Sequence, residues 1–371
     1  MKKQLFAALI AIVFIGSNAL AYYGPNDKSK KPTGKPKANC SPATAKYIME
    51  FNDVRALIEQ GGSMFQNRQN GVAAYEVPKG SNRFAIFAGA LWMGGTDVNG
   101  QLKLAALRYR AGNDFWPGPL SVTPGTGNYN PLFPVGDGAI RDFGEANIDP
   151  DQCIAYDQFY TIRKAEVIRF NIWWECQAGI TTECDDVQAP SNEELNRIYN
   201  WPAHGDVSKG QDYFLAPYYD RDQDGNYNPD NGDHPWYDDI LGRDDIQCGF
   251  DRRISLFGDE THWWVFNDKG NIHTETNGDP IGMEIRAQAF SFATNDEVNK
   301  MTFYNYELIN RGTQTLYDTY FAQYLDADVG NYADDYAGCD VSRGLGYMYN
   351  GDLNDENDGG KLGYGDNPPA I

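Results

Sequence analysis

Glycine and proline interrupt this chain so often that we expect short strands joined by turns. Its 371 residues include 39 Gly and 19 Pro, which favour turns over a helical bundle. The chain also contains 8 Trp, 19 Phe and 24 Tyr, and disordered chains lack aromatic residues because they have no core to fill. We therefore expect a folded, mainly β protein: antiparallel sheets packed in a β-sandwich-like arrangement, decorated by short helices and long ordered loops.

Apolar runs of strand length indicate where the sheets form. Residues 84–98 and 102–109 are separated by Asn99-Gly100, which is typical of a type I′ hairpin turn. In the last third of the chain, 311–314 is expected to connect the final two strands as a hairpin. The strands expected there are 261–267, 281–292, 301–310 and 315–326.

Three segments are expected to be helical. Asn52-Asp53 precedes the apolar residues 54–58 and is followed by Gly61-Gly62, a pattern of N-cap and C-terminal glycine. Residues 164–174 carry apolar residues at helical spacing. A further helix is expected to begin at Ser191 and to stop before Pro202.

The N-terminus has the features of an export signal. Two lysines precede the apolar run 5–15, and Ala-Leu-Ala at 19–21 is a typical cleavage site. The apolar run is too short to span a bilayer, which takes about 20 residues, and no later segment is long enough. We therefore expect a signal peptide at 1–21 and a mature protein without a transmembrane segment, either extracellular or on the outer cell surface.

The mature chain is expected to contain two linkers and two subdomains. Residues 22–39 are rich in Lys and Pro and read as a solvated linker. A β-rich subdomain with the Asn-Gly hairpin is expected at 40–190, and a β-sandwich subdomain at 191–350. Residues 351–371 are rich in Gly and Asp and are expected to be a linker at which the sequence is truncated.

Charge and cysteine content narrow the functional classes. The formal net charge of −21 argues against a nucleic-acid partner, because binding to phosphates is driven by Lys and Arg. An even number of cysteines, six, indicates disulfides in an oxidising compartment. Only Cys176 and Cys184 are close in sequence, and they are the expected pair.

An acidic loop in the second half of the chain predicts a calcium site. Three carboxylates at a spacing of two are followed by Gly225, which matches the first half of a calcium-binding loop. Such a cluster carries like charges within a few Å, whose repulsion a cation relieves. The expected role of the ion is structural, because the protein supplies every ligand. The expected ligands are Asp220, Asp222, Asp224, Asn226, Asn228 and Asp233.

The loop is not an EF-hand. Asn231 stands where an EF-hand has its bidentate Glu, and Pro229 blocks a following helix. Asn226 is expected to offer its backbone carbonyl. Asp233 is the expected closing carboxylate, so the loop is closer to those of dockerin or thrombospondin-like repeats.

A second acidic cluster follows the last expected strand, and three interpretations remain open for it. It is either a second metal site, a carboxylate pair for glycoside cleavage or a solvated acidic loop. The first two aspartates lie at the end of the strand and are expected to share one face. The cluster consists of Asp326, Asp328, Asp334, Asp335 and Asp340.

Catalytic motifs are missing: the sequence has no HExxH helix, GxSxG elbow or P-loop. His204, in the string 201–206, is expected to be hydrogen-bonded to Asp206 or to a backbone carbonyl rather than to act as a general base. In each of the pairs Trp173-Trp174 and Trp263-Trp264, one ring is expected to face a core, so core packing is the expectation, although exposed rings would stack on sugars.

A series of strings in fixed order extends along nearly all of residues 40–371. The strings are 52–59, 75–80, 87–95, 113–119, 201–206, 220–233 and 303–340. Together they resemble large secreted or surface proteins of Bacteroidota that leave the cell through the type IX secretion system. The resemblance implies a removable signal peptide and, further along the full protein, a C-terminal sorting domain read by that secretion machinery. It implies a location and no established reaction.

From these features we expect an exported, calcium- and disulfide-stabilised structural or adhesion module without catalysis of its own. A cell-surface glycan or protein is the expected partner. The competing interpretation is a secreted hydrolase or glycan-binding protein, which uses Asp326, Asp328 or His204 beside exposed Trp residues. That alternative requires those side chains to converge in one cleft, because general acid–base groups act within hydrogen-bond reach of substrate.

Overall fold

The computed structural model describes residues 38–109, 112–122, 146–238 and 255–371. The chain divides into two units, 1–35 and 36–371, and all described residues belong to the second. The expected signal peptide lies outside the described residues. So does most of the expected linker at 22–39, although its described residue Ala38 is buried. None of the described helices is long and apolar enough to cross a membrane.

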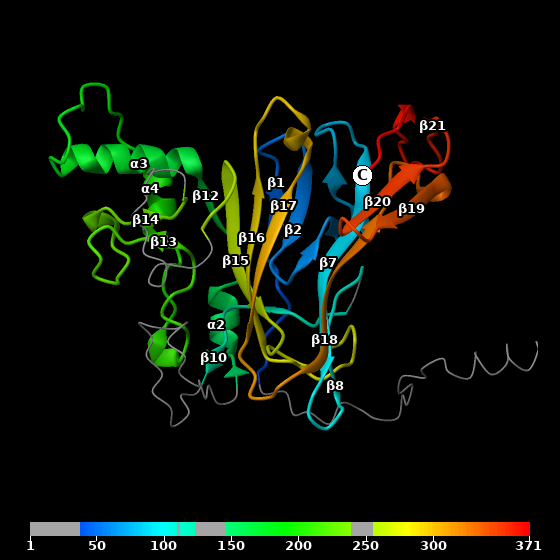
Figure 1. Ribbon diagram of the computed structural model, residues 1–371, viewed down its shortest axis with the longest axis horizontal. Helices are drawn as coiled ribbons and strands as arrows, with labels where there is room; N and C mark the ends of the chain where they lie inside the picture. The colour runs from blue at the N-terminus through cyan, green and yellow to red at the C-terminus, as the bar shows by residue number, and fades with distance from the viewer. Residues whose placement is uncertain (1–37, 110–111, 123–145, 239–254) are drawn as a thin grey trace, which may run out of the picture. The chain divides into compact units, whose positions relative to one another are not determined.

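Two antiparallel sheets form the centre of this unit, so the mainly β prediction is confirmed (Figure 1). The first sheet has the order β1-β2-β3-β7-β18, with β6 beside β2 and β7, and β8 beside β7. Its strands are β1 (Lys46–Met49), β2 (Arg55–Glu59), β3 (Ser63–Met64), β6 (Tyr75–Glu76), β7 (Phe84–Thr96), β8 (Leu102–Ala105) and β18 (Tyr317–Ala327). The second sheet has the order β12-β15-β16-β17, with β9 beside β15. Its strands are β9 (Trp116–Pro117), β12 (Tyr160–Arg163), β15 (Glu260–Asn267), β16 (Met283–Ser291) and β17 (Phe303–Asn310).

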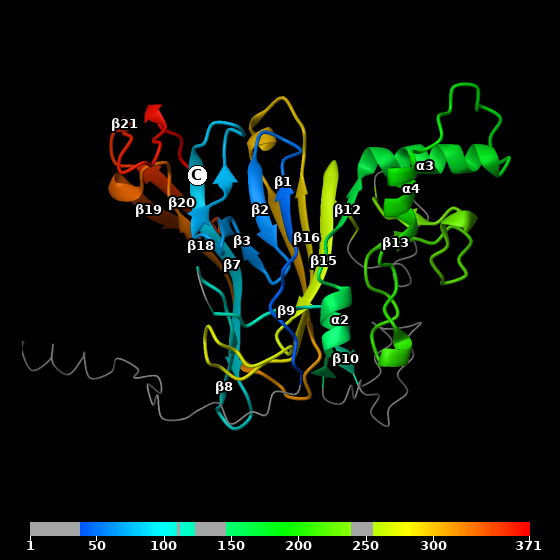
Figure 2. The ribbon, with the colours of Figure 1, turned by 180° about the vertical axis from the view of Figure 1, so that it is seen from behind.

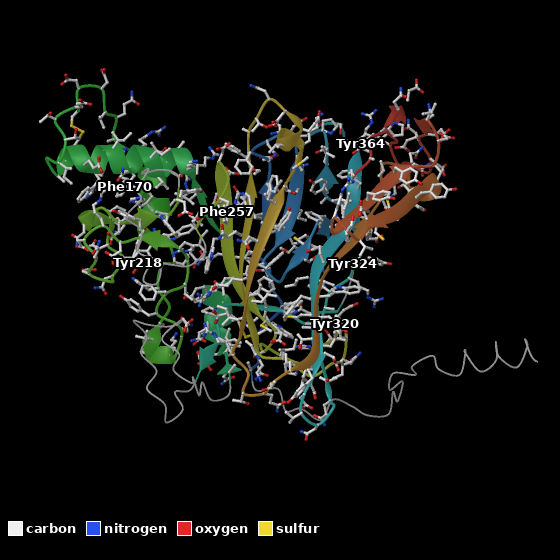
Figure 3. The ribbon with its side chains drawn as sticks, viewed as in Figure 1. Phe170, Tyr218, Phe257, Tyr320, Tyr324 and Tyr364 are labelled. Atoms are coloured by element: carbon white, nitrogen blue, oxygen red, sulfur yellow. A yellow bond between two sulfur atoms is a disulfide. The ribbon has the colours of Figure 1, made fainter. Side chains whose placement is uncertain are left out.

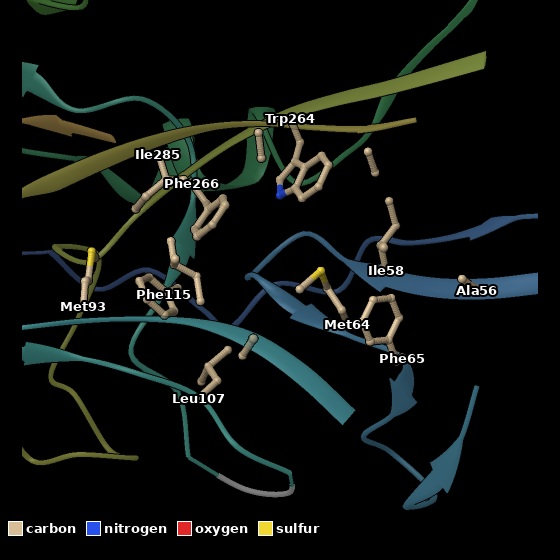
Figure 4. Packing of buried hydrophobic residues seen from close by; sticks show 14 of the residues in the cluster. Ala56, Ile58, Met64, Phe65, Met93, Leu107, Phe115, Trp264, Phe266 and Ile285 are labelled. Atoms are coloured by element: carbon tan, nitrogen blue, oxygen red, sulfur yellow. The ribbon is translucent and has the colours of Figure 1, made fainter. Parts of the chain in front are cut away.

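The main hydrophobic core lies between the two sheets, as expected for a sandwich. Ile58 and Met64 of the first sheet pack in one cluster with Trp264, Phe266 and Ile285 of the second sheet. Figure 4 shows these side chains projecting toward one another from the facing strands. All five are at most 1% exposed, so removal of this apolar surface from water is the main stabilising contribution here.

Strand β15 is buried on both faces because a further layer covers its other side. Alternate residues point in opposite directions: Trp264 and Phe266 join the core between the sheets, whereas Trp263 and Val265 join a second hydrophobic cluster. Helices α3 and α4 lie on this second side, away from the first sheet (Figure 2). The prediction of core packing is therefore confirmed for Trp263 and Trp264.

Helices form at two of the three places expected. α3 (Lys164–Gln177) and α4 (Asn192–Tyr199) confirm the predictions, and α2 (Pro150–Ala155) is an additional short helix. Ser191 caps α4: its side chain accepts a hydrogen bond from Glu194 N, and the Glu194 carboxylate accepts one from Ser191 N.

The remaining short elements are β4 (Gln66–Asn67), β5 (Val72–Ala73), β10 (Ser121–Val122), β11 (Ala146–Asn147), η1 (Val207–Lys209), β13 (Tyr218–Tyr219), η2 (Pro229–Asn231), β14 (His234–Pro235), η3 (Glu297–Lys300), η4 (Tyr332–Asp334), β19 (Asp335–Asp340), β20 (Leu345–Asn350), β21 (Asn354–Asp355) and β22 (Gly365–Asp366).

The helix predicted at 54–58 is wrong, because this segment is strand β2. Asn52 accepts a hydrogen bond from Val54 N as an N-cap would, but the chain then extends between β1 and β6. Four of the five strand residues are buried, and a surface helix would bury only one stripe. The Gly61-Gly62 pair turns the chain into β3, with Gly62 at φ +82°.

The predicted Asn-Gly hairpin is present, but its turn differs from type I′. β7 pairs with β8 from Thr96 opposite Leu102, and Gly100 has φ +74° while Asn99 is not in the positive-φ region. The Asp97 carboxylate accepts hydrogen bonds from Asn99 N and from the N–H of Gln101. A side chain therefore stabilises this longer loop, where a type I′ turn would need two residues at positive φ.

The hairpin predicted at 311–314 is wrong. β17 pairs with β16, and β18 pairs with β7, so the connection crosses from one sheet to the other. Its first residue, Arg311, is buried and forms ion pairs with Asp212 and Glu284.

The predicted boundary at residue 190 does not separate two sheets. β12 pairs with β15, and β7 pairs with β18, across that position. Residues 351–371, expected to be a linker, carry β21 and β22 and include Asp355, which is 1% exposed. Ile371 exchanges two backbone hydrogen bonds with Met348 of β20. This segment is therefore folded onto the rest of the unit.

Candidate metal centre

The acidic loop 220–233 is closed at its base by two short strands. β13 and β14 pair antiparallel, with Tyr218 opposite Pro235 and Tyr219 opposite His234. The loop bends within its acidic stretch, where Gly225 has φ +83°, a conformation that glycine adopts at little cost. This bend brings later residues of the loop back toward the first aspartate, and Gly225 N donates to Asp220 Oδ2 over 2.8 Å.

The three aspartates at the start of the loop converge on one point. Asp220, Asp222 and Asp224 each offer a carboxylate oxygen, and these oxygens lie within 4.8 Å of one another. Within the described part of the chain, no other three His, Cys, Asp or Glu side chains come together so closely. Asp220 Oδ1 is buried and accepts no hydrogen bond. The sequence prediction therefore placed these three carboxylates correctly with respect to one another.

The other three predicted ligands have partners within the fold. Asn226 Oδ1 accepts a hydrogen bond from the Tyr213 hydroxyl, and Asn228 Oδ1 accepts one from Asp230 N over 3.1 Å. Asp233 is fully buried, and its two oxygens accept from Arg221 N and Asn228 N, each over 2.8 Å. To act as predicted ligands, Asn228 and Asp233 would have to share their side-chain oxygens with existing donors, whereas Asn226 was predicted to bind through its backbone carbonyl.

Asp233 nevertheless experiences the negative charge of the triad formed by Asp220, Asp222 and Asp224. Burial, with smaller contributions from the charges of Asp220 and Asp222, raises the pKa of Asp233 to about 6, against the two backbone hydrogen bonds that lower it. Burial also raises the pKa of Asp220. A divalent cation at the triad would offset this unfavourable accumulation of negative charge.

Arg221, which the sequence did not single out, joins the loop to helix α3. Its guanidinium pairs with Glu175 over 3.1 Å, donates to Asn171, and lies over the Trp174 ring at 4.8 Å. Trp174 Nε1 in turn donates to the backbone carbonyl of Asp230 over 3.0 Å. An Arg between Asp residues usually indicates a solvated charge, so its anchoring role has no local sequence signal.

Three tyrosines join the loop to helix α4 and to the second hydrophobic cluster. Tyr227 donates from its hydroxyl to Ile198 O over 2.7 Å, and Tyr199 donates to Asp230 Oδ1. Tyr218 and Tyr227 pack against the second cluster, which includes Phe170 of α3; Figure 3 shows Phe170 and Tyr218 within this layer. The acidic loop is therefore part of a packed layer.

His204 is a structural residue of the same layer. Its Nε2 accepts a hydrogen bond from Tyr227 N over 2.8 Å, and its Nδ1 lies 3.0 Å from Tyr213 O, to which the neutral ring donates. Burial lowers the pKa of His204. Both nitrogens are occupied by backbone groups, as predicted, so neither is available to act as a general base.

A buried histidine in β14 makes stability depend on pH. His234 is 1% exposed, donates from Nδ1 to Gly232 O, and has its pKa lowered by burial from 6.5 to about 4. Because the unfolded chain binds this proton more readily, stability is lost as pH falls from about 6.5 toward 4. We expect the free energy of unfolding of the native protein to fall by about 3 kcal/mol more than that of His234→Asn over this range.

Urea unfolding of both proteins at pH 7, 5.5 and 4.5 measures this difference. Asn keeps an N–H donor for Gly232 but does not titrate, so the common contribution of the acidic residues cancels in the comparison. Parallel pH profiles for the two proteins would contradict the prediction.

The second acidic cluster is only partly assembled. Asp326 and Asp328 flank a register shift at the end of β18, so strict strand alternation does not place them on one face. Asp340 lies at the other end of β19 from Asp335, about 17 Å along the strand, where it accepts hydrogen bonds from Ser342 and Arg343 in the turn. Asp340 is therefore removed from the cluster.

Two residues that the sequence analysis missed belong to this region. Asp355 is 1% exposed and accepts from Asn331 N and Tyr364 N over 3.1 and 2.6 Å. Asn350 is 7% exposed and lies opposite Asp335 in the β19–β20 ladder. Both lie in Gly- and Asn-rich sequence, which indicates turns and gave no sign of burial.

The described residues form two disulfides. Cys176–Cys184 confirms the predicted pair, with 5.8 Å between the Cα atoms. Cys40–Cys153 joins the start of the described chain to α2, with 5.9 Å between the Cα atoms. Cys339 is a free, exposed thiol, and Cys248 lies outside the described residues.

No protein-family model, curated protein or solved structure matches this chain. The fold and the geometry of the loop are therefore the basis for the function proposed below.

Proposed function

We propose that this protein is an exported β-sandwich module without catalysis of its own, which acts in structure or adhesion at the cell surface or as a secreted protein. We propose further that calcium at Asp220, Asp222 and Asp224, together with its disulfides, stabilises it. The observation that carries this proposal is the convergence of three carboxylates in a loop packed against α3 and α4. Calcium suits such a site because it takes oxygen ligands, and weak sites are useful at extracellular calcium concentrations.

The proposed location rests on the N-terminal signal pattern and on the disulfides, which persist in oxidising compartments. The proposed export route is the type IX secretion machinery, and its support is the resemblance to Bacteroidota secreted and surface proteins. The missing nucleophile motifs and the occupied His204 favour a module without catalysis over a hydrolase.

Exposed aromatic side chains support a role in adhesion. Aromatic rings on a surface provide large apolar faces for a glycan or protein partner. Tyr320 and Tyr324 lie along β18 in Figure 3, and the β19–β20 hairpin continues the series. The exposed members are Tyr317, Tyr320, Phe321, Tyr332, Tyr336, Tyr347 and Tyr349.

Calcium is expected to stabilise the protein through the triad. At a concentration about 100 times its Kd, an ion that binds only the folded state adds about 2.7 kcal/mol to the free energy of unfolding. Thermal or urea unfolding of the full chain in calcium and in a chelator measures this increment. We expect Asp222→Asn/Asp224→Asn to reduce it strongly, because the amides remove two of the three charges at the site.

The matched control is Asp185→Asn/Asp186→Asn, which removes the same charge from two exposed positions outside the loop. This control is expected to keep the full calcium increment. Equal increments for the two double variants would show that calcium acts elsewhere, and an unchanged Tm of the native protein in chelator would remove calcium from the proposal.

A further inference from the structure

The base of the β19–β20 hairpin brings two polar side chains together inside the fold. Asp335 and Asn350 are directly opposite in the ladder, so their side chains project from the same face with Cβ atoms about 5 Å apart. Asn350 is 7% exposed. The hairpin base is therefore a place where the side chain of a half-buried aspartate meets that of a buried asparagine.

Both side chains have an oxygen without a donor. Asp335 Oδ1 and Asn350 Oδ1 are buried and accept no hydrogen bond, and the same is true of the neighbouring Asp334 Oδ1. Buried polar atoms in folded proteins are nearly always paired, and each unpaired one costs about 1–3 kcal/mol. Three such acceptors at the base of one hairpin indicate a missing positive partner.

A flipped amide does not resolve the unpaired oxygen of Asn350. Its Nδ2 donates to the backbone carbonyls of Asp352 and Asn354, over 3.4 and 3.3 Å. A flip would place the amide oxygen against these two carbonyls and leave them without this donor. The observed orientation therefore directs Nδ2 toward the loop after β20 and leaves Oδ1 for the Asp335 side of the hairpin.

Surrounding contacts hold the acidic groups in place. Asp335 Oδ2 accepts from Val329 N over 2.8 Å, and Asp355 accepts from Asn331 N and Tyr364 N. Burial raises the pKa of Asp335 to about 6, and the charges of Asp355, Asp328 and Asp334 contribute in the same direction. The negative charges of these carboxylates therefore lie close enough to act on one another.

We propose that the hairpin base is a second divalent-cation site, in which Asp335, Asn350 and Asp334 bind calcium through their unpaired Oδ1 atoms. An all-oxygen set of carboxylates and an amide, completed by water, suits calcium. The site is distinct from the triad of the loop 220–233. It would fix the hairpin to the first sheet, because Asp328 N and Gly330 N donate to the β7 carbonyls of Ala85 and Phe84.

Counting bound ions on the full chain tests this proposal. Equilibrium dialysis against calcium, with metal analysis of the protein, is expected to give two ions for the native protein and one for Asp335→Asn. Asp334→Asn provides a second variant, for which at least a tenfold weaker second ion is expected. Asp340→Asn is the matched control at the far end of the same strand and is expected to keep two ions.

The two calcium sites are distinguishable in the same experiment. Asp222→Asn/Asp224→Asn is expected to lose the loop ion and to keep the hairpin ion. Circular dichroism in chelator verifies that each variant has the native fold before its ions are counted. A folded Asp335→Asn or Asp334→Asn protein that binds as many ions as the native chain, with unchanged affinity, would overturn the hairpin site whatever happens at the loop.

Discussion

Replacing Glu284 by Ala is expected to lower the free energy of unfolding by about 3–5 kcal/mol. Glu284 is fully buried, and its Oε1 lies 2.8 Å from Arg286 and 3.3 Å from Arg311. Its Oε2 accepts from Leu120 N over 2.9 Å. The substitution leaves Asp212 as the remaining buried carboxylate that pairs with both guanidinium groups, and Arg286 keeps a longer contact of 3.8 Å with the half-buried Glu307. Both buried positive charges therefore lose a shared, fully buried counter-charge.

Urea unfolding in calcium, with the disulfides intact, measures this effect. The matched control is Glu297→Ala, which breaks an exposed pair with Lys300 and is expected to cost less than about 1 kcal/mol. Equal effects of the two substitutions on the free energy of unfolding would show that the buried ion pairs do not stabilise the second sheet. Glu284→Gln keeps an acceptor for Leu120 N and is expected to fall between the two.

Removal of the Cys40–Cys153 disulfide is the second large effect that we expect. This bond links residues 113 positions apart, and closing a loop of that length restricts the unfolded chain by about 5 kcal/mol in the chain-entropy model. Cys40→Ser/Cys153→Ser is therefore expected to lower the free energy of unfolding by several kcal/mol. Both cysteines lie in a small buried cluster with Trp116 and Leu120, so the introduced hydroxyls add to the cost.

Cys176→Ser/Cys184→Ser is the internal comparison. Its bond spans 8 positions, for which the same model gives about 2.5 kcal/mol, and its cysteines are more exposed than those of the other bond. Chemical unfolding of the two double variants side by side measures the difference. A larger loss for the short loop than for the long one would contradict the entropic argument.

Local sequence patterns were enough to predict the strands and the helix start named below, because neighbouring residues determine these conformations. Apolar runs between turn residues located β7 and β15–β18, and Ser191 with Glu194 located the start of α4. The spacing of Asp220, Asp222 and Asp224 around a glycine bend predicted their convergence. In each of these cases, the residues that decide the conformation are within a few positions of one another.

Long-range pairing was not predictable in the same way. Nothing in the residues 311–314 distinguishes a hairpin from a crossing between sheets, because the partners of β17 and β18 are set by β16 and β7. The helix prediction for 54–58 was wrong for the same reason. The cap-like residues before it favour a helix locally, but β1 on one side and β6 on the other hold the segment as a strand.

Acidic residues have two roles here that the sequence does not separate. Asp114 and Asp268 are fully buried, and each accepts hydrogen bonds from three backbone N–H groups of distant loops. Many carboxylates of the chain thus accept hydrogen bonds from backbone N–H groups in loops. A fold rich in irregular connections requires such acceptors, because its loop backbone lacks strand or helix partners. A buried clamp such as Asp233 and an exposed carboxylate such as Asp222 both occur in Gly- and Asn-rich turns, so burial decides between them.

Strand β15 makes the sandwich and the layer formed by α3, α4 and the loop 220–233 interdependent. Trp264 and Phe266 fill one cluster, while Trp263 and Val265 of the same strand fill the other. If α3, α4 and the acidic loop detached, the indole of Trp263 would meet water on a strand whose opposite face still carries the main core. Mechanical load applied to the loop would reach the centre of the sandwich in part through this eight-residue strand.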